Sequence, residues 1–122
     1  MNVKNIVRKV IVANPNISLR KVAKIMSEKK VGSIVFMKSG KVLGILTEKD
    51  IVRNYLKLNK KASSVMSKNP VCIDIHEDID SAARLMQKFR IKRLLVSEKN
   101  KLVGIISVTD IIANSEDLNE FF

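Results

Sequence analysis

The second half of this chain repeats the first at a fixed spacing of 60 residues. The segment Gly44–Ile51, GILTEKDI, recurs as Gly104–Ile111, GIISVTDI. Further identical pairs at the same spacing are Ala23 and Ala83, Met26 and Met86, Lys41 and Lys101, and Asn54 and Asn114. A self-similar period of this length indicates one supersecondary unit that is present twice. We therefore expect a binding site in one copy to have a counterpart in the other.

The length of the chain suits one compact object better than two separate ones. A chain of 122 residues is about one domain long, whereas a unit of about 60 residues buries a smaller share of its surface. Hydrophobic residues make up 46% of the chain, so a core can form. We predict two copies, residues 1–60 and 61–122, packed around a shared core.

The sequence has no segment that is typical of membrane insertion or export. No apolar run approaches the roughly 20 residues of a membrane span, and the N-terminus lacks the pattern of a signal peptide. The single cysteine, Cys72, cannot form an internal disulfide, which fits a reducing cytoplasm. We expect a cytoplasmic protein without a membrane partner, in which Cys72 is a small core residue on a strand.

Both copies contain the same predicted elements in the same order. In the first copy, apolar residues at helical spacing follow Ser18, which suits an N-cap. The runs Ser33–Met37 and Lys41–Leu46 form a predicted hairpin with a turn at Gly40. A second helix is expected directly after Thr47, which can cap it.

The sequence of the second copy predicts the same helices and strands. A helix follows Asp78, the hairpin strands are Arg93–Val96 and Leu102–Ile106, and a last helix runs from Val108 to about Asn114. Asn100 stands where Gly40 stands in the first copy, and both residues tolerate the positive φ of a turn.

A short extended piece precedes the first helix of each copy, Val10–Ala13 and Val71–Asp74. A polar linker, Leu58–Asn69, joins the copies, and an acidic tail, Ser115–Phe122, follows the second. The order is thus β-α-β-β-α, twice. This order predicts a mixed α/β (α+β) fold.

The positive charge of the chain is concentrated in one copy. The formal net charge is +11, and residues 1–60 hold 14 basic and 3 acidic side chains, whereas residues 61–122 hold nine of each. Such a field attracts polyanions, which include nucleotides, nucleic acid, acidic proteins and anionic membranes. The alternative is a lysine-rich surface that only keeps the protein soluble.

The repeated motif places a hydroxyl and a carboxylate at the start of a helix. Free backbone N–H groups and the positive dipole end would suit a phosphate there, and Thr47 adds a hydroxyl. Asp50 can accept two hydrogen bonds from a cis-diol, as carboxylates do for ribose, while Gly44 leaves room for a close approach on the strand. The alternative is that Thr47 and Asp50 only cap their own helix.

These motifs resemble those of the CBS domain, and the whole chain resembles a stand-alone tandem CBS pair, also called a Bateman module. Gly44–Asp50 and Gly104–Asp110 both match the family signature Gly-h-h-Thr/Ser-x-x-Asp, where h is apolar. Val65–Val71 resembles the lead-in to the second repeat, and Ile91–Val96 resembles its first hairpin strand. The resemblance covers about residues 5–114.

The resemblance implies a pseudo-two-fold pair that binds adenosyl ligands in two clefts between the repeats. In the family these ligands are AMP, ADP, ATP, S-adenosylmethionine and sometimes dinucleotides. Ribose recognition is implied at Asp50 in what we name the first cleft and at Asp110 in the second cleft. Thr47, Ser107 and Thr109 are implied near the ribose or the phosphate.

The resemblance also implies that the two clefts differ in charge. In related pairs, residues at the start of the other repeat's first hairpin strand meet the phosphate. For the first cleft these are Lys92 and Arg93, and for the second cleft they are the neutral Gly32 and Ser33. We therefore predict that the first cleft prefers the more phosphorylated ligand, with Lys49 adding charge.

The sequence contains no constellation that indicates catalysis. The one histidine, His76, lies in an acidic stretch without a second nitrogen or thiolate ligand for a metal. No nucleophile–base set and no Walker-type glycine–lysine loop can be named. We expect a protein that binds nucleotide, has no metal or required cofactor, and is not an enzyme.

Two functions from different classes remain open. The first is a regulatory module that senses an adenosyl ligand and acts on a separate partner protein, as a homodimer of CBS pairs. Apolar residues for the dimer contact are Ile51, Tyr55, Ile111 and Ile112, which would otherwise complete the intrachain core. The second is nucleic-acid binding by the basic half, although the chain offers few aromatic residues for stacking.

Overall fold

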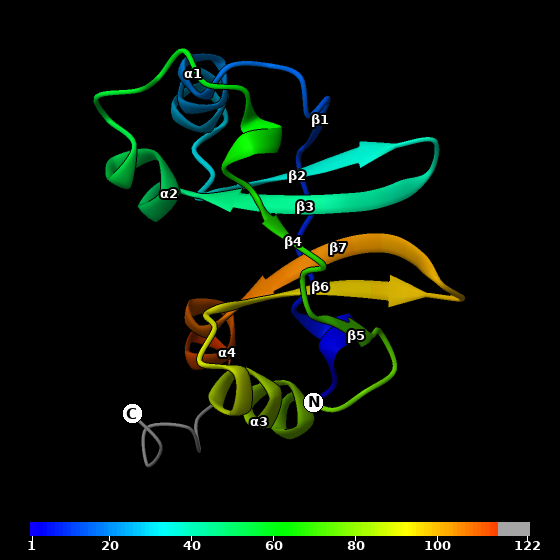
Figure 1. Ribbon diagram of the computed structural model, residues 1–122. Helices are drawn as coiled ribbons and strands as arrows, with labels where there is room; N and C mark the ends of the chain where they lie inside the picture. The colour runs from blue at the N-terminus through cyan, green and yellow to red at the C-terminus, as the bar shows by residue number, and fades with distance from the viewer. Residues whose placement is uncertain (115–122) are drawn as a thin grey trace. The chain divides into compact units, whose positions relative to one another are not determined.

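The computed structural model describes residues 1–114, which form four α-helices and two β-sheets (Figure 1). The mixed α+β class is therefore confirmed. The chain divides into two compact units. We name residues 10–70 the first-repeat unit, and residues 1–9 together with residues 71–114 the second-repeat unit. The acidic tail predicted from Ser115 lies outside the described residues.

The compact units do not part at the repeat boundary expected between residues 60 and 61. Residues 1–9 fold with the second repeat, and residues 61–70 fold with the first. The exchange has a packing reason: Val3 and Ile6 are buried in the second-repeat unit, and Ala62 is buried in the first-repeat unit. Each unit therefore completes its core with residues from the start of the other copy.

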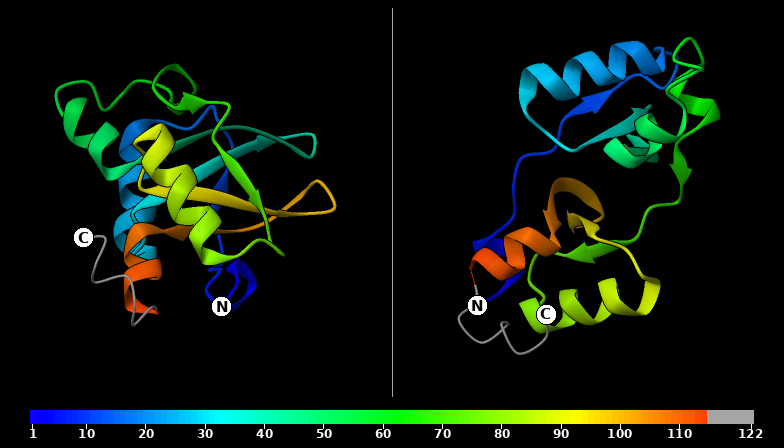
Figure 2. Two further views of the ribbon diagram at one scale, coloured as in Figure 1. Left: turned by 90° about the horizontal axis from the view of Figure 1, so that it is seen from below. Right: turned by 90° about the vertical axis from the view of Figure 1, so that its left-hand side faces the viewer.

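The first-repeat unit is a four-stranded sheet with two helices on one face (Figures 1 and 2). Its elements are β1 Val12–Ala13, α1 Leu19–Lys29, β2 Ser33–Lys38, β3 Lys41–Thr47, α2 Glu48–Arg53, a 3-10 turn Ala62–Ser64 and β4 Ser67–Lys68. The strand order is β1-β2-β3-β4, with β1 parallel to β2 and the other pairs antiparallel. The strand β4 lies in the segment that the sequence predicted to be only a linker.

Helix α1 begins where its sequence predicts. The Ser18 Oγ accepts a hydrogen bond of 3.1 Å from the Lys21 backbone N–H, which confirms Ser18 as the N-cap. The helix ends at Lys30, whose φ of 55° is left-handed. Between these ends the inward side chains pack in the core of the unit, which consists of Leu19, Val22, Met26, Ile34, Phe36, Leu46 and Ala62.

Helix α2 ends at Arg53, before the apolar residues Tyr55 and Leu56. The Asn54 side-chain Nδ2 donates to the Asp50 carbonyl at 2.8 Å, while the Asn54 backbone N–H turns to the Ile51 carbonyl at 3.1 Å. The Asn54 side chain thus occupies the Asp50 carbonyl, to which the Asn54 backbone N–H would donate if the α-helix continued. The helix therefore ends at Arg53. Tyr55 consequently lies beyond the helix and is 68% exposed. Asn114 makes the same bond to Asp110 in the other unit, which explains why this pair is identical between repeats.

The second-repeat unit repeats this architecture with a different fourth edge. Its elements are a 3-10 turn Val3–Asn5, β5 Cys72–Asp74, α3 Ile79–Phe89, β6 Arg93–Glu98, β7 Lys101–Ser107 and α4 Val108–Ala113. The strand order is β5-β6-β7, with β5 parallel to β6. Beyond β7, Arg8 forms an isolated antiparallel bridge with Ile105 through two backbone hydrogen bonds of 3.0 Å.

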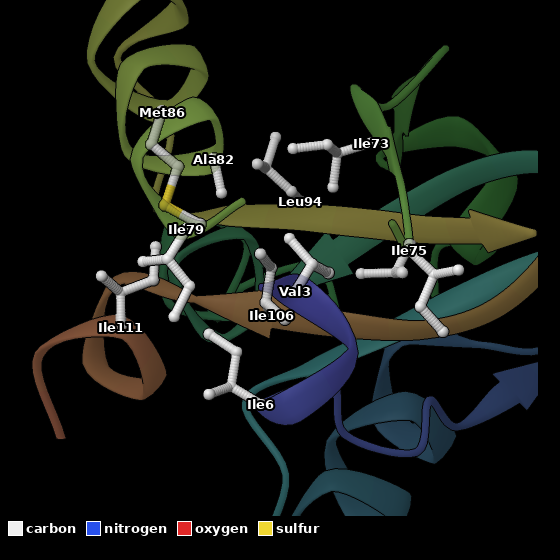
Figure 3. Close-up of a cluster of buried hydrophobic side chains, with 11 residues drawn as sticks. Val3, Ile6, Ile73, Ile75, Ile79, Ala82, Met86, Leu94, Ile106 and Ile111 are labelled. Atoms are coloured by element: carbon white, nitrogen blue, oxygen red, sulfur yellow. The ribbon is translucent and has the colours of Figure 1, made fainter. Parts of the chain in front are cut away.

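The core of the second-repeat unit joins the N-terminal segment to the second repeat (Figure 3). Its buried residues are Val3, Ile6, Ile73, Ile75, Ile79, Ala82, Met86, Leu94, Val96, Ile106 and Ile111. Strand β5 alternates, so Ile73 points inward and its neighbour Cys72 is exposed. The prediction that Cys72 is a core residue is therefore wrong, because the pleat gives the inward position to the isoleucine.

The hairpins have the turns that the sequence predicts. Gly40 has a φ of 77° and Asn100 a φ of 63° at equivalent places. The ends of all four hairpin strands lie within two residues of the predicted ends.

Acid is expected to destabilise the protein in part through the N-cap of α3. The Asp78 Oδ1 accepts the Ser81 backbone N–H at 2.7 Å, and this bond lowers the pKa of Asp78 below its ordinary value of 3.8. A lowered folded-state pKa contributes stability that is present above the unfolded-state pKa and is lost as the pH falls through the folded-state pKa. Urea unfolding of wild type should therefore show a loss of stability below about pH 4. Asp78→Asn, which still caps the helix, should show a smaller loss, and an identical pH dependence would contradict this role.

Candidate functional site

The two copies of the repeated motif lie where a strand passes into a short helix. In the first-repeat unit this junction is between β3 and α2. The Asp50 Oδ2 accepts hydrogen bonds from the Thr47 backbone N–H at 2.9 Å and from the Thr47 Oγ1 at 3.3 Å. Within residues 1–114, no hydrogen bond or ion pair engages the other carboxylate oxygen, Oδ1.

The second-repeat unit builds the same arrangement between β7 and α4. The Asp110 Oδ2 accepts from the Ser107 backbone N–H at 2.9 Å and from the Ser107 Oγ at 3.0 Å. The Asp110 N–H in turn donates to the Ser107 Oγ at 3.2 Å, which completes a capping box. Each aspartate thus caps its own helix with one oxygen, and capping leaves the second oxygen for another partner.

The helices behind these junctions are too short to carry a phosphate site by themselves. Helices α2 and α4 have six residues each. The helix dipole sums over aligned peptide units, so a helix of this length adds little charge at its N-terminus. A phosphate at either junction would need side-chain cations or further backbone donors.

In the first-repeat unit the junction meets the start of the first hairpin strand. Ser33 is the register partner of Thr47, and the Glu48 N–H donates to the Gly32 carbonyl at 3.2 Å. The Ser33 residue is buried. Gly32 and Ser33 therefore lie beside the Thr47–Asp50 pair of their own unit.

In the second-repeat unit the equivalent positions carry cations. Arg93 is the register partner of Ser107, and the Val108 N–H donates to the Lys92 carbonyl at 2.9 Å. Arg93 is half-buried and Lys92 is exposed. Within one unit, Lys92 and Arg93 thus flank the Ser107–Asp110 pair.

Two other predicted site residues lie at the surface of their helices. Lys49 and Thr109 are the second residues of α2 and α4, and both are exposed. Among the described residues, neither side chain makes a hydrogen bond or an ion pair with the capping aspartate.

The structure adds one residue that the sequence did not predict. The Arg8 Nη1 lies 3.3 Å from the Asp110 Oδ1, the oxygen that capping leaves free. The side chain of Arg8 is 65% exposed and that of Asp110 is 12% exposed. Sequence reasoning missed Arg8 because it lies at the start of the first copy, while its partner belongs to the second.

The two motif glycines, Gly44 and Gly104, leave room for the chain's own backbone. A Cβ on Gly44 would lie 2.7 Å from the Ser67 carbonyl oxygen, and one on Gly104 would lie 2.5 Å from the Arg8 carbonyl oxygen. The expected close approach at Gly44 is therefore present, but the approaching group is a neighbouring segment of its own unit.

His76 and possible groups of metal-ligating side chains are the remaining candidates for a functional site in the described part of the chain. His76 is exposed, with its Nε2 3.6 Å from the Glu98 Oε2. Residues 1–114 contain no group of three or more His, Cys, Asp or Glu side chains that could hold a metal ion. No helix in the same range is long and apolar enough to cross a membrane.

Comparison with known proteins decides the family. The model of the CBS domain matches the chain twice, at residues 3–57 and 62–117. The chain belongs to the CBS domain family. Each match contains one strand–helix junction with its capping aspartate, so both candidate sites lie within CBS domains.

Two relatives show how this CBS pair compares in sequence. It is 35% identical to the uncharacterized protein MJ1232 of Methanocaldococcus jannaschii over 107 residues, which is 87% of this chain and 36% of that protein. It is 30% identical to the CBS domain-containing protein YhcV of Bacillus subtilis over 105 residues, which is 83% of this chain and 75% of that protein. The chain thus spans about a third of the length of the archaeal relative.

A solved structure confirms the fold of the CBS pair. The CBS domain pair of protein MJ0100, in complex with 5′-methylthioadenosine and S-adenosyl-L-methionine, matches with a TM-score of 0.85 and 29% identity. The match covers 93% of this chain and 94% of that one.

Proposed function

We propose that this CBS pair is a regulatory module that binds an adenosyl ligand and passes the binding event to a separate partner protein. The observation that carries the proposal is the pair of aspartates, Asp50 and Asp110, each with one carboxylate oxygen that capping does not use. The similar CBS pair of MJ0100 was crystallised with two adenosyl ligands. AMP, ADP, ATP and S-adenosylmethionine are the ligand candidates.

The carboxylate oxygen that capping does not use, Oδ1 of each aspartate, suits the ribose of such a ligand. A carboxylate oxygen carries two lone pairs, so it can accept both hydroxyl donors of a cis-diol. Capping holds the carboxylate in place before the ligand arrives, which reduces the entropy lost on binding. Thr47, Ser107 and Thr109 are proposed to lie near the ribose or the phosphate.

The phosphate contacts are a separate part of the proposal. The cations proposed to contact the phosphate of the ligand are Lys92, Arg93 and Lys49. At the second cleft, the positions equivalent to Lys92 and Arg93 are the neutral Gly32 and Ser33. An arginine offers a planar fork of donors that matches a phosphate in a bidentate way, which a lysine cannot do. Arg93 is therefore the cation of this set to which we assign the larger role.

Signalling is proposed to act through conformation or assembly. The pair is expected to bind its ligand without chemical change, and to associate as a homodimer. Ile111 is buried in the core of its unit, so it is not available for a dimer contact. Val52 in α2 is 68% exposed, and Tyr55 and Leu56 just beyond α2 are 68% and 80% exposed. These exposed side chains are the apolar surface that a second copy would cover.

Calorimetric titration of the wild-type chain with AMP, ADP, ATP and S-adenosylmethionine tests the proposal. We expect saturable binding of at least one of them, with little change between low and moderate salt, because the ribose contacts are hydrogen bonds to a half-buried carboxylate. Absence of binding by all four would contradict the proposed function.

The same titration is run with short DNA and RNA, because the charge keeps the second function open. Residues 10–70 hold 13 basic and 3 acidic side chains, a net charge of +10. Nucleic-acid binding by this surface would weaken steeply as salt rises. Such binding without any response to the adenosyl ligands would favour the alternative function.

A further inference from the structure

The two aspartates differ in what occupies their free oxygen. The Oδ1 of Asp110 lies 3.3 Å from a guanidinium nitrogen of Arg8, whereas Asp50 has no ion pair within residues 1–114. The two junctions are otherwise built alike, from the same cap and the same strand register. The flanking residues also differ, Gly32 and Ser33 in one unit and Lys92 and Arg93 in the other. Within residues 1–114, however, Arg8 is the one cation that forms an ion pair with a capping aspartate.

Strand register shows which residue replaces Arg8 in the first-repeat unit. Arg8 pairs with Ile105 beyond β7, and Ser67 pairs with Ile45 beyond β3. Ile45 and Ile105 are equivalent in the repeat, so Ser67 and Arg8 occupy equivalent positions beside equivalent aspartates. Ser67 is too short to imitate the long arginine side chain and carries no charge.

The placement of Arg8 has opposite consequences for neutral and anionic ligands. A neutral nucleoside must displace the guanidinium from the Asp110 Oδ1 and offers it no new partner. A ligand that carries a phosphate supplies one, and charge-assisted bonds between arginine and phosphate are strong. Because the Arg8 side chain is 65% exposed, it can leave the aspartate without being trapped in the core.

We infer that Arg8 makes the Asp110 site select ligands with an anionic group over neutral nucleosides, whereas the Asp50 site lacks this selection. The inference rests on the proposed adenosyl binding. It assigns the stronger phosphate preference to Asp110, which is opposite to the preference predicted from Lys92 and Arg93 alone.

A reciprocal exchange of the two equivalent residues tests the inference. AMP and adenosine are titrated into Asp50→Ala, in which only the Asp110 site remains, with and without Arg8→Ser. Loss of the guanidinium should strengthen adenosine binding by about two- to fivefold, since an exposed ion pair is weak. It should weaken AMP binding by about tenfold, since a charge-assisted phosphate contact is lost. The converse change, Ser67→Arg in the Asp110→Ala background, should raise the preference of the Asp50 site for AMP.

These variants should fold, because the Arg8 and Ser67 side chains are exposed and the Arg8 bridge to Ile105 uses backbone groups only. An AMP-to-adenosine affinity ratio that Arg8→Ser leaves unchanged would overturn the inference while the adenosyl-binding function stands. Failure of the Asp50→Ala protein to bind either compound, while the Asp110→Ala protein binds both, would also overturn it. Failure of the wild type to bind AMP and adenosine would overturn the inference, whereas the proposed function would fall only if ADP, ATP and S-adenosylmethionine also failed to bind.

Discussion

Replacing either capping aspartate by alanine is expected to remove adenosyl binding at one site and leave the other site intact. A hydrogen bond to a charged group contributes about 1.5–3 kcal/mol, so loss of the Asp50 or Asp110 carboxylate should weaken binding at that site by about 10- to 100-fold. Calorimetry should show the stoichiometry of a protein that binds two ligands fall to one in each single variant. The double variant should bind none.

The controls must separate ligand binding from helix capping, since both aspartates also cap a helix. Asp50→Asn and Asp110→Asn keep a similar shape and an acceptor oxygen, so they should lose less affinity than the alanine variants. Asp78→Ala removes a carboxylate that caps α3 and is not proposed to bind ligand. It should lower stability without changing affinity. Unchanged affinity in the folded Asp50→Ala and Asp110→Ala proteins would show that these carboxylates only cap.

The order of elements was predictable from local chemistry. Ser18 and Asp78 cap the helices that follow them, and Gly40 and Asn100 take the positive φ of their turns. These features depend on residues close in sequence, and the repeat supplied each of them twice. The pairing of a hydroxyl residue with an aspartate three positions later was predictable for the same reason, because a capping box is a local motif.

What the sequence did not reveal depends on contacts between distant segments. Arg8 lies 102 positions from Asp110 in the sequence, and the repeat does not indicate the contact because it joins the start of the first copy to the end of the second. Strand β4 is not predictable from local sequence, because it has only two residues, Ser67 and Lys68, and is defined by its pairing with β3. Cys72 was misplaced because an alternating strand of three residues is too short to show which side faces inward.

The end of α2 shows another reason why a prediction from sequence can be wrong. Apolar residues at 51, 52, 55 and 56 fit one helical face, yet Asn54 diverts the Asp50 carbonyl to its own side chain and ends the helix at Arg53. The repeat shows that Asn54 and Asn114 are identical, but the bonds by which they end their helices are visible only in the structure. A polar side chain that competes for a backbone acceptor can thus override an apolar pattern.

Alanine at Gly104 is expected to destabilise the protein strongly, because the position is filled by the chain's own backbone. A Cβ there would lie 2.5 Å from both the Arg8 carbonyl oxygen and the Val7 Cγ2. Overpacking of this kind costs about 1–3 kcal/mol, and the Arg8 carbonyl, which accepts the Ile105 N–H at 3.0 Å, cannot move away without weakening that bond. Urea unfolding should show the free energy of unfolding fall by about 2–3 kcal/mol. Amide exchange at Arg8 and Ile105 should accelerate.

Gly44→Ala is the matched variant, because its nearest obstacles include the Met66 side chain at 2.8 Å as well as the Ser67 carbonyl at 2.7 Å. A methionine side chain adapts more easily than backbone, so the loss should be smaller. Gly40→Ala is the control for conformation alone, since nothing lies within 4 Å of its added Cβ and its φ is 77°. It should cost about 1–2 kcal/mol from the left-handed backbone without faster exchange at Arg8 and Ile105. Wild-type stability and amide protection in Gly104→Ala would contradict the close packing of residues 7 and 8 against β7.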